Sequence, residues 1–144
     1  TAAASITSHI VINENLPAGL VTEAWDPIPS DLARYHLPAR SERNHLINIL
    51  EVLARVQIAT AAPFADIMRQ ESIHLPWGTT LTLITGGQNE ELLDMLAYLK
   101  QKGFAVSLVL IQPPSTTTVV EIRTDQINIP IHRIWQESDL EGRL

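Results

Sequence analysis

Apolar residues recur at helical spacing in three stretches of the first half of the chain. Ala2 to Asn13 is small and apolar and predicts a helix. Ser41 is a suitable N-cap for a second helix, whose apolar positions lie three or four residues apart: Leu46, Ile49, Leu50, Leu53 and Val56. Pro63 suits the first position of a third helix, which Phe64, Ile67 and Met68 continue as far as His74.

Strand-like patterns surround these helices. Leu16 to Thr22 (LPAGLVT) predicts a short buried strand. Trp25 to Leu32 (WDPIPSDL) contains two prolines, which fix φ and lack an N–H donor, and it predicts a turn region. Arg34 to Leu37 predicts a short edge strand that Pro38 ends.

The clearest pattern is a strand, a helix and a second strand between Thr79 and Ile111. Thr79 to Thr85 (TTLTLIT) is β-branched and apolar, and Gly86-Gly87 follows as a turn. The helix that follows has Asn89 as its cap, acidic residues in its first turn, lysines in its last turn and Gly103 at its end. Phe104 to Ile111 (FAVSLVLI) is nearly all apolar, as in a strand buried on both faces. This order predicts an α/β fold with a mostly parallel sheet and helices on both faces.

The last thirty residues give a weaker pattern. Thr116 to Arg123 favours a strand because it is rich in β-branched residues. Ile127 to Trp135 (INIPIHRIW) predicts another strand. Pro130 indicates that this strand lies at an edge of the sheet or that Pro130 is near the start of the strand. Asp139 to Leu144 predicts one helical turn.

Composition limits the class of protein. The 144 residues fit a single domain, 1–144, and 45% hydrophobic residues supply a core. The net charge is −6 and the ten Lys and Arg are scattered, so we expect neither a nucleic-acid partner nor direct membrane contact. The chain contains no cysteine, which excludes disulfides and thiolate ligands.

Local motifs for catalysis are weak. LITGGQNEELLD (83–94) has a strand, a glycine pair and a helix start, but its glycines match neither phosphate-loop pattern, and two glutamates lie where a phosphate would bind. The five histidines have no HxxxH or HExxH spacing, and the carboxylates Asp26, Asp31, Glu42 and Asp66 occur in separate segments. Three tryptophans are candidate interface anchors or partly buried core residues: Trp25, Trp77 and Trp135.

Five stretches in sequence resemble a known family. They are AASITSHIVINENLPAGLVTEAW, LPARSERNHLINILEVLARVQ, APFADIMRQESIHLPWGTTLTLITGG, ELLDMLAYLKQKGFAVSLVLI and INIPIHRIWQESDL. Their order and spacing are similar to the bacterial domain-of-unknown-function family fifty-eight, which carries a von Willebrand factor type A-like domain. The resemblance implies a von Willebrand type A-like fold, which is Rossmann-like and has three layers. It also implies that the chain is the C-terminal portion of such a domain, without the first strand. It implies a helix between Pro114 and Gln126, where composition favours a strand.

The resemblance also implies a metal-ion-dependent adhesion site that has lost its ligands. Such a site combines a DxSxS motif, a loop Thr and an Asp, whose oxygens suit a hard divalent cation. The first motif would lie before this chain. The loop Thr would align with Ala62, although Thr60 is close, and the Asp would align with Gly86. We therefore expect a degenerate site with no metal ion, and no cofactor.

Our first hypothesis is a non-enzymatic protein-binding module. The expected partner-binding rim lies at the carboxyl ends of the strands: Thr60, Ala62, Gly86, Gly87 and Gln88. The resemblance implies a MoxR-type AAA+ ATPase as the partner and a cytoplasmic location in a membrane-anchored parent. Without the first strand, which the resemblance places in the middle of the sheet, its two neighbours would pair directly or leave backbone groups unmatched. We therefore expect the chain either to form a homodimer or to rearrange so that the gap is filled. The alternatives are a small-molecule or nucleotide-binding enzyme domain on a doubly wound sheet, and a scaffold within the parent.

Overall fold

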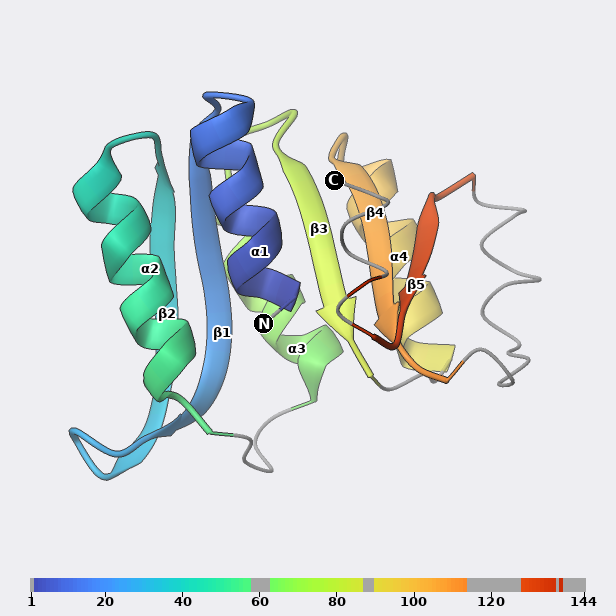
Figure 1. Ribbon diagram of the computed structural model, residues 1–144. Helices are drawn as coiled ribbons and strands as arrows, with labels where there is room; N and C mark the ends of the chain where they lie inside the picture. Colours follow the sequence, from blue (N-terminus) through green and yellow to red (C-terminus); the bar gives the residue numbers. More distant parts are fainter. Residues whose placement is uncertain (1, 58–62, 87–89, 114–127, 137, 139–144) are drawn as a thin grey trace. The chain divides into compact units, whose positions relative to one another are not determined.

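The computed structural model describes residues 2–57, 63–86, 90–113, 128–136 and 138 of the chain (Figure 1). These residues divide into two compact units, Thr1–Pro63 and Phe64–Arg143, called unit 1 and unit 2 below. Both units combine helices and strands, so the chain is of mixed α/β class. The single domain expected from the sequence stays a prediction.

Unit 1 has a helical start, a β-hairpin and a second helix. The predicted first helix is confirmed as α1 (Ala2–Ser8), which continues as the π-helical turn η1 (His9–Asn13). Strands β1 (Ala18–Asp26) and β2 (Asp31–Arg40) pair antiparallel, and α2 (Arg43–Arg55) follows. Helix α2 packs against α1 and both strands. A small core of Val11, Ala18 and Leu46 joins η1, β1 and α2.

The hairpin is longer than its sequence predicts. Strand β1 extends four residues beyond the predicted end at Thr22, and its residues range from buried to exposed. The predicted turn region, Trp25 to Leu32, is wrong at both ends, because only residues 27–30 form the turn. Pro27 and Pro29 both lie in that turn, where a missing N–H donor does not interrupt the hydrogen bonds between the strands.

The predicted end of the second strand at Pro38 is also wrong. Strand β2 continues through Pro38 to Arg40. The register of its pairing with β1 shifts at Gly19, between Ala18 and Leu20. A Cβ atom on Gly19 would lie 2.5 Å from the Leu37 carbonyl oxygen, so only glycine fits there. The bulge and the glycine together accommodate a proline within a strand.

Helix α2 begins one residue later than expected. Its N-cap is Glu42, with no side-chain capping bond, so the prediction of Ser41 as the cap is wrong. The apolar stripe is confirmed. Of the predicted positions, Leu46 and Ile49 are buried, and Leu50, Leu53 and Val56 are half-buried. Val52, which was not predicted, is buried as well. This stripe is what fixes the helix on the hairpin.

Unit 2 contains the predicted strand–helix–strand segment. Its elements are α3 (Phe64–Ser72), β3 (Thr80–Thr85), α4 (Glu90–Gln101), β4 (Ala105–Ile111) and β5 (Ile131–Ile134). The sheet has the order β3-β4-β5, and both pairings are parallel. Helix α4 packs against β4 and α3, as Figure 1 shows for the yellow and orange segments. The predicted α/β class with a parallel sheet is therefore confirmed.

The end of α4 follows its sequence signals. Gly103 has φ +95°, a conformation that glycine adopts without strain, and the Phe104 N–H donates to the Leu99 carbonyl at 3.3 Å. The indole ring of Trp77 lies against Gly103, so a larger residue there would meet the ring. The turn thereby sets where β4 begins.

The strands of unit 2 differ in burial. Leu108, Val109 and Leu110 are buried in β4, as expected of a strand covered on both faces, whereas Ala105 near its start is exposed. The predicted last strand, Ile127 to Trp135, is confirmed in its middle only: β5 covers Ile131–Ile134 and is an end strand among the described strands. It begins directly after Pro130, whose carbonyl accepts a bond from the Leu108 N–H at 2.9 Å. Pro130 therefore lies at the strand start, as predicted.

The described strands form two sheets, one in each unit. Within the described ranges, β1 belongs to a two-stranded sheet and β3 to a separate three-stranded sheet. The direct pairing expected of the neighbours of the first strand stays a prediction.

Some predictions fall outside the described residues. They concern Asn89 as a cap, the strand Thr116 to Arg123, the start of the last strand at Ile127, and the helical turn Asp139 to Leu144. No helix in the described ranges combines the length and the apolar character that crossing a membrane requires.

The core position of Ile49 can be tested against a neighbour on the same helix. Ile49 is 0% exposed and Ile47 is 44% exposed, and both lie in α2. We expect Ile49→Ala to lower the free energy of unfolding by about 2–5 kcal/mol, because it leaves a cavity, and Ile47→Ala by about 1 kcal/mol or less. Urea unfolding of both variants measures this, and equal losses would contradict the packing of α2.

Candidate functional site

The carboxyl edge of the parallel sheet gathers residues from all three strands of unit 2. Gly86 follows β3, Gln112 follows β4, and Trp135 follows β5. Because parallel strands end at the same edge, these three residues lie at one end of the sheet. We call Gly86, Gln112 and Trp135 the carboxyl rim.

Gln112 connects the three strands of the carboxyl rim. Its backbone N–H donates to the Ile134 carbonyl at 3.1 Å, and its side-chain amide donates to the Gly86 carbonyl at 3.3 Å. The residue is buried, so these bonds form away from solvent. Gln112 therefore holds the ends of β3 and β5 at fixed positions beside β4.

Trp135 supplies the exposed apolar side chain of the carboxyl rim. It is 54% exposed directly after β5. A large, rigid side chain that stays partly in water is a common anchor of protein interfaces. Of the three tryptophans weighed from the sequence, Trp135 is the one that the fold brings to the strand ends.

Gly86 is the one residue of the predicted rim within the described ranges. It lies at the carboxyl end of β3, as the strand pattern predicted. A Cβ atom there would meet only the Ile111 carbonyl oxygen, at 3.6 Å, so the position has room for a side chain. Its role in binding stays a prediction. The other four residues, Thr60, Ala62, Gly87 and Gln88, lie outside the described ranges.

Gln112 was not singled out from the sequence. A usable signal existed, because it is the first polar residue after the apolar run Phe104 to Ile111. A polar residue directly after a buried parallel strand lies at the edge where ligands bind in such sheets.

The rim residues do not fit a divalent cation. Gly86, where the resemblance expects an Asp, has no side-chain oxygen, and the nearby Gln112 amide points an N–H at the Gly86 carbonyl. In the described part of the chain, no group of three His, Asp or Glu side chains could hold a metal ion. The expectation of a metal-free site stays a prediction.

The helix start after β3 does not favour phosphate. Helix α4 has Glu90 and Glu91 in its first turn. These carboxylates place negative charge where the free N–H groups of a helix start would otherwise attract an anion.

A buried carboxylate in unit 1 is the strongest electrostatic feature of the described residues. Asp26, at the end of β1, is 0% exposed. It accepts bonds from the Tyr35 hydroxyl, from the Ile28 N–H at 3.0 Å and from the Arg55 guanidinium at 3.0 Å. Arg55 also donates to the Tyr35 oxygen at 3.4 Å. The cluster ties β1, β2 and α2 together.

The partners of Asp26 also decide its charge. Burial alone would raise the pKa of Asp26, but the Tyr35 hydroxyl, the Ile28 amide and the Arg55 guanidinium together hold the pKa below its usual value. The same cluster raises the pKa of Arg55, chiefly through its bonds to Tyr35 and Asp26. A carboxylate held ionised with its oxygens occupied is a poor proton acceptor, so Asp26 is a structural residue.

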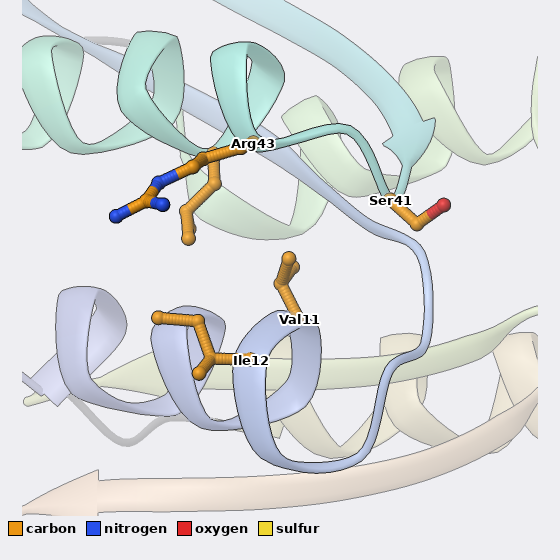
Figure 2. A pocket seen from close by; sticks show the side chains of 5 residues that line it. Val11, Ile12, Ser41 and Arg43 are labelled. Carbon is orange, nitrogen blue, oxygen red and sulfur yellow. The ribbon is translucent and has the colours of Figure 1, made fainter.

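A small pocket lies elsewhere in unit 1, between η1 and the start of α2. It has a volume of about 260 Å³ and is lined by Val11, Ile12, Ser41, Arg43 and Leu46. Figure 2 shows Val11 and Ile12 facing Arg43 across the opening, while the Ser41 hydroxyl points away. A pocket of this size is below the usual range for small-molecule sites.

No protein-family model matches the chain, and none of the curated proteins compared with it does. The resemblance to the von Willebrand type A-like family therefore stays a hypothesis that rests on the five sequence stretches.

Replacing Asp26 tests the polar cluster of unit 1. We expect Asp26→Asn to lower the stability at neutral pH, because Arg55 loses its ion pair. The pKa of Asp26 in the folded state lies below its ordinary value of 3.8. The contribution of the ionised Asp26 to stability is therefore fully present above pH 3.8, and it is lost as the pH falls through the folded-state pKa. The stability gap between wild type and variant should therefore narrow below pH 3.8. Urea unfolding at several pH values measures it, and a gap independent of pH would contradict this assignment.

Proposed function

We propose that this chain is a non-enzymatic protein-binding module of the von Willebrand factor type A kind, with a partner-binding surface at the carboxyl rim of unit 2. The observation that carries the proposal is the exposed Trp135 beside Gly86 and Gln112 at the carboxyl edge of a parallel sheet. Open α/β sheets bind their ligands at this edge. Of the rim predicted from the sequence, this surface includes Gly86.

Two observations support a binding role over catalysis. The buried carboxylate Asp26 is fully engaged by its neighbours, and the rim residues Gly86, Gln112 and Trp135 have no titratable side chain. General acid–base chemistry requires a titratable group within reach of the substrate. The rim offers instead an aromatic surface and backbone groups.

The resemblance extends the proposal to a partner and a place in the cell. Its family implies a MoxR-type AAA+ ATPase as the partner, and a membrane-anchored parent that holds this domain in the cytoplasm. It also implies helices on both faces of the sheet. The replacement of an expected Thr by Ala62 and an expected Asp by Gly86 supports a degenerate adhesion site, in which contact with the partner does not pass through a metal ion.

Two exposed tryptophans at opposite ends of unit 2 allow a matched test of the rim. Trp135 follows β5, whereas Trp77 precedes β3 and is 86% exposed. We expect Trp135→Ala to weaken capture of a purified MoxR-type ATPase about 10-fold or more, as for an interface anchor, and Trp77→Ala to leave it unchanged. Biolayer interferometry measures both. Equal affinities for Trp135→Ala and wild type would refute this placement of the binding surface.

The enzyme alternative makes a different prediction. A nucleotide-binding domain would gain several degrees of thermal stability from saturating ATP, GTP or NAD. We expect no shift in the melting temperature with these ligands or with Mg²⁺. A reproducible stabilisation of several degrees by one of them would favour the alternative over the binding module.

A further inference from the structure

Gln112 uses its backbone and its side chain on opposite sides of β4. Its backbone N–H points to β5, where it donates to the Ile134 carbonyl at 3.1 Å. The N–H and C=O groups of one strand residue point to the same side, so this backbone cannot also bond to β3. The side-chain amide reaches the other way and donates to the Gly86 carbonyl at 3.3 Å. The side chain therefore gives β3 the donor that the backbone gives to β5.

This bond is made where the chain turns out of β3. The Ala105 N–H donates to the Thr79 carbonyl at 3.2 Å, so the carbonyls of Thr79 and of every second residue after it face β4. A straight continuation of the strand would turn the Gly86 carbonyl away from β4. Gly86 instead lies in a bend directly after β3, and its carbonyl accepts the bond from Gln112. The Gln112 amide therefore fastens the bend by which the chain leaves the sheet.

The residue type of Gly86 does not enforce this bend. Its φ is not positive, so the backbone conformation is open to other residues. A Cβ atom on Gly86 would lie 3.6 Å from the Ile111 carbonyl oxygen, which is an ordinary contact. A different residue could follow the same path, whereas loss of the hydrogen bond would release it. The path at the end of β3 thus depends on a side chain of β4.

Glutamine suits this position by its chemistry. Gln112 is 9% exposed, so its amide is largely withdrawn from water and needs partners within the protein. A primary amide donates a hydrogen bond without carrying a charge. An ionised glutamate has no donor and would face the carbonyl oxygen of Gly86, and a methionine offers no N–H. The two replacements therefore remove the donor in different ways while they keep the length of the side chain.

We propose that the side-chain amide of Gln112 is a positioning group of the carboxyl rim: it fixes the path by which the chain leaves β3, and thereby the surface that a partner meets. This inference rests on the proposed function, because that function makes the rim a binding surface. Gln112 acts through Gly86. Its backbone bond to β5 does not depend on its side chain, so a substitution should move the Gly86 end of the rim and leave Trp135 in place.

NMR of the isotope-labelled chain tests the positioning without any partner. At neutral pH we expect Gln112→Glu and Gln112→Met to shift the signals of the Gly86 amide and the Gly86 carbonyl carbon, while the indole signal of Trp135 stays in place. Gln101→Glu is the matched control, since it makes the same chemical change at an exposed position of α4, and it should shift none of these signals. Unshifted Gly86 signals in either Gln112 variant would overturn the proposal.

Acid should restore the bond in one of the two variants. A protonated carboxyl group carries an O–H that can donate to the Gly86 carbonyl in place of the amide. Burial raises the pKa of a carboxyl group at this position above the ordinary glutamate value of about 4.3. As the pH falls through that raised pKa, the Gly86 signals of Gln112→Glu should return toward those of wild type, and those of Gln112→Met should not. Altered packing alone gives no such recovery, so identical pH profiles of the two variants would overturn the proposal.

Affinity for a purified MoxR-type ATPase, measured by biolayer interferometry, connects the positioning to binding. At neutral pH we expect both Gln112 variants to bind about 10-fold more weakly than wild type, and Gln101→Glu to bind like wild type. Gln112 variants with shifted Gly86 signals and unchanged affinity would overturn the proposal while the proposed function stands. A wild type that does not bind would refute the proposed function, and this inference would fall with it, although the NMR signals would still report the Gln112 bond.

Discussion

The parallel pairing of β3 with β4 is the interaction on which the proposed binding surface depends. Helix α4 carries the chain from the end of β3 back to the start of β4, and the Gly103 turn ends that crossover. The parallel direction brings the strand ends to one edge, where Gln112 bonds to its neighbours on both sides. It also divides the backbone groups of β3 into a set that faces β4 and a set that faces outward. The rim is thus a result of this ladder.

Unit 1 is organised by a different constraint, the need to satisfy a buried charge. Asp26 lies at the end of β1, and its bonds to Tyr35 and Arg55 connect both strands of the hairpin to α2. A charge without these partners would be costly to bury, so the cluster fixes the hairpin relative to the helix. The same bonds remove the carboxylate from any chemistry. This arrangement supports the proposed binding role of the carboxyl rim.

The sequence predicted the elements whose signals are local. Helix α4 and strand β4 were found because acidic and basic turns, Gly103 and a continuous apolar run all agree. The hairpin was predicted too short because Pro38 is a residue that usually ends a strand. The pairing with β1, where Gly19 lies opposite, shows how the strand accommodates this proline. Ser41 has the right chemistry for a cap, but Glu42 occupies the position. The Asp26–Arg55 pair joins residues 29 positions apart, which no local spacing reveals. Gln112 acquires its role only when three strands end together.

The central claim is that a partner binds at the carboxyl rim of the parallel sheet. Titration of the isotope-labelled chain with an unlabelled MoxR-type ATPase, followed by NMR, tests it most directly. The account predicts that the amide signals of Gly86 and Gln112 and the indole signal of Trp135 shift or broaden first. The signals of Trp77 and Gly103, at the opposite end of the sheet, should stay unchanged. Perturbation confined to Trp77 and Gly103, or to the Val11 and Arg43 pocket, would contradict the account.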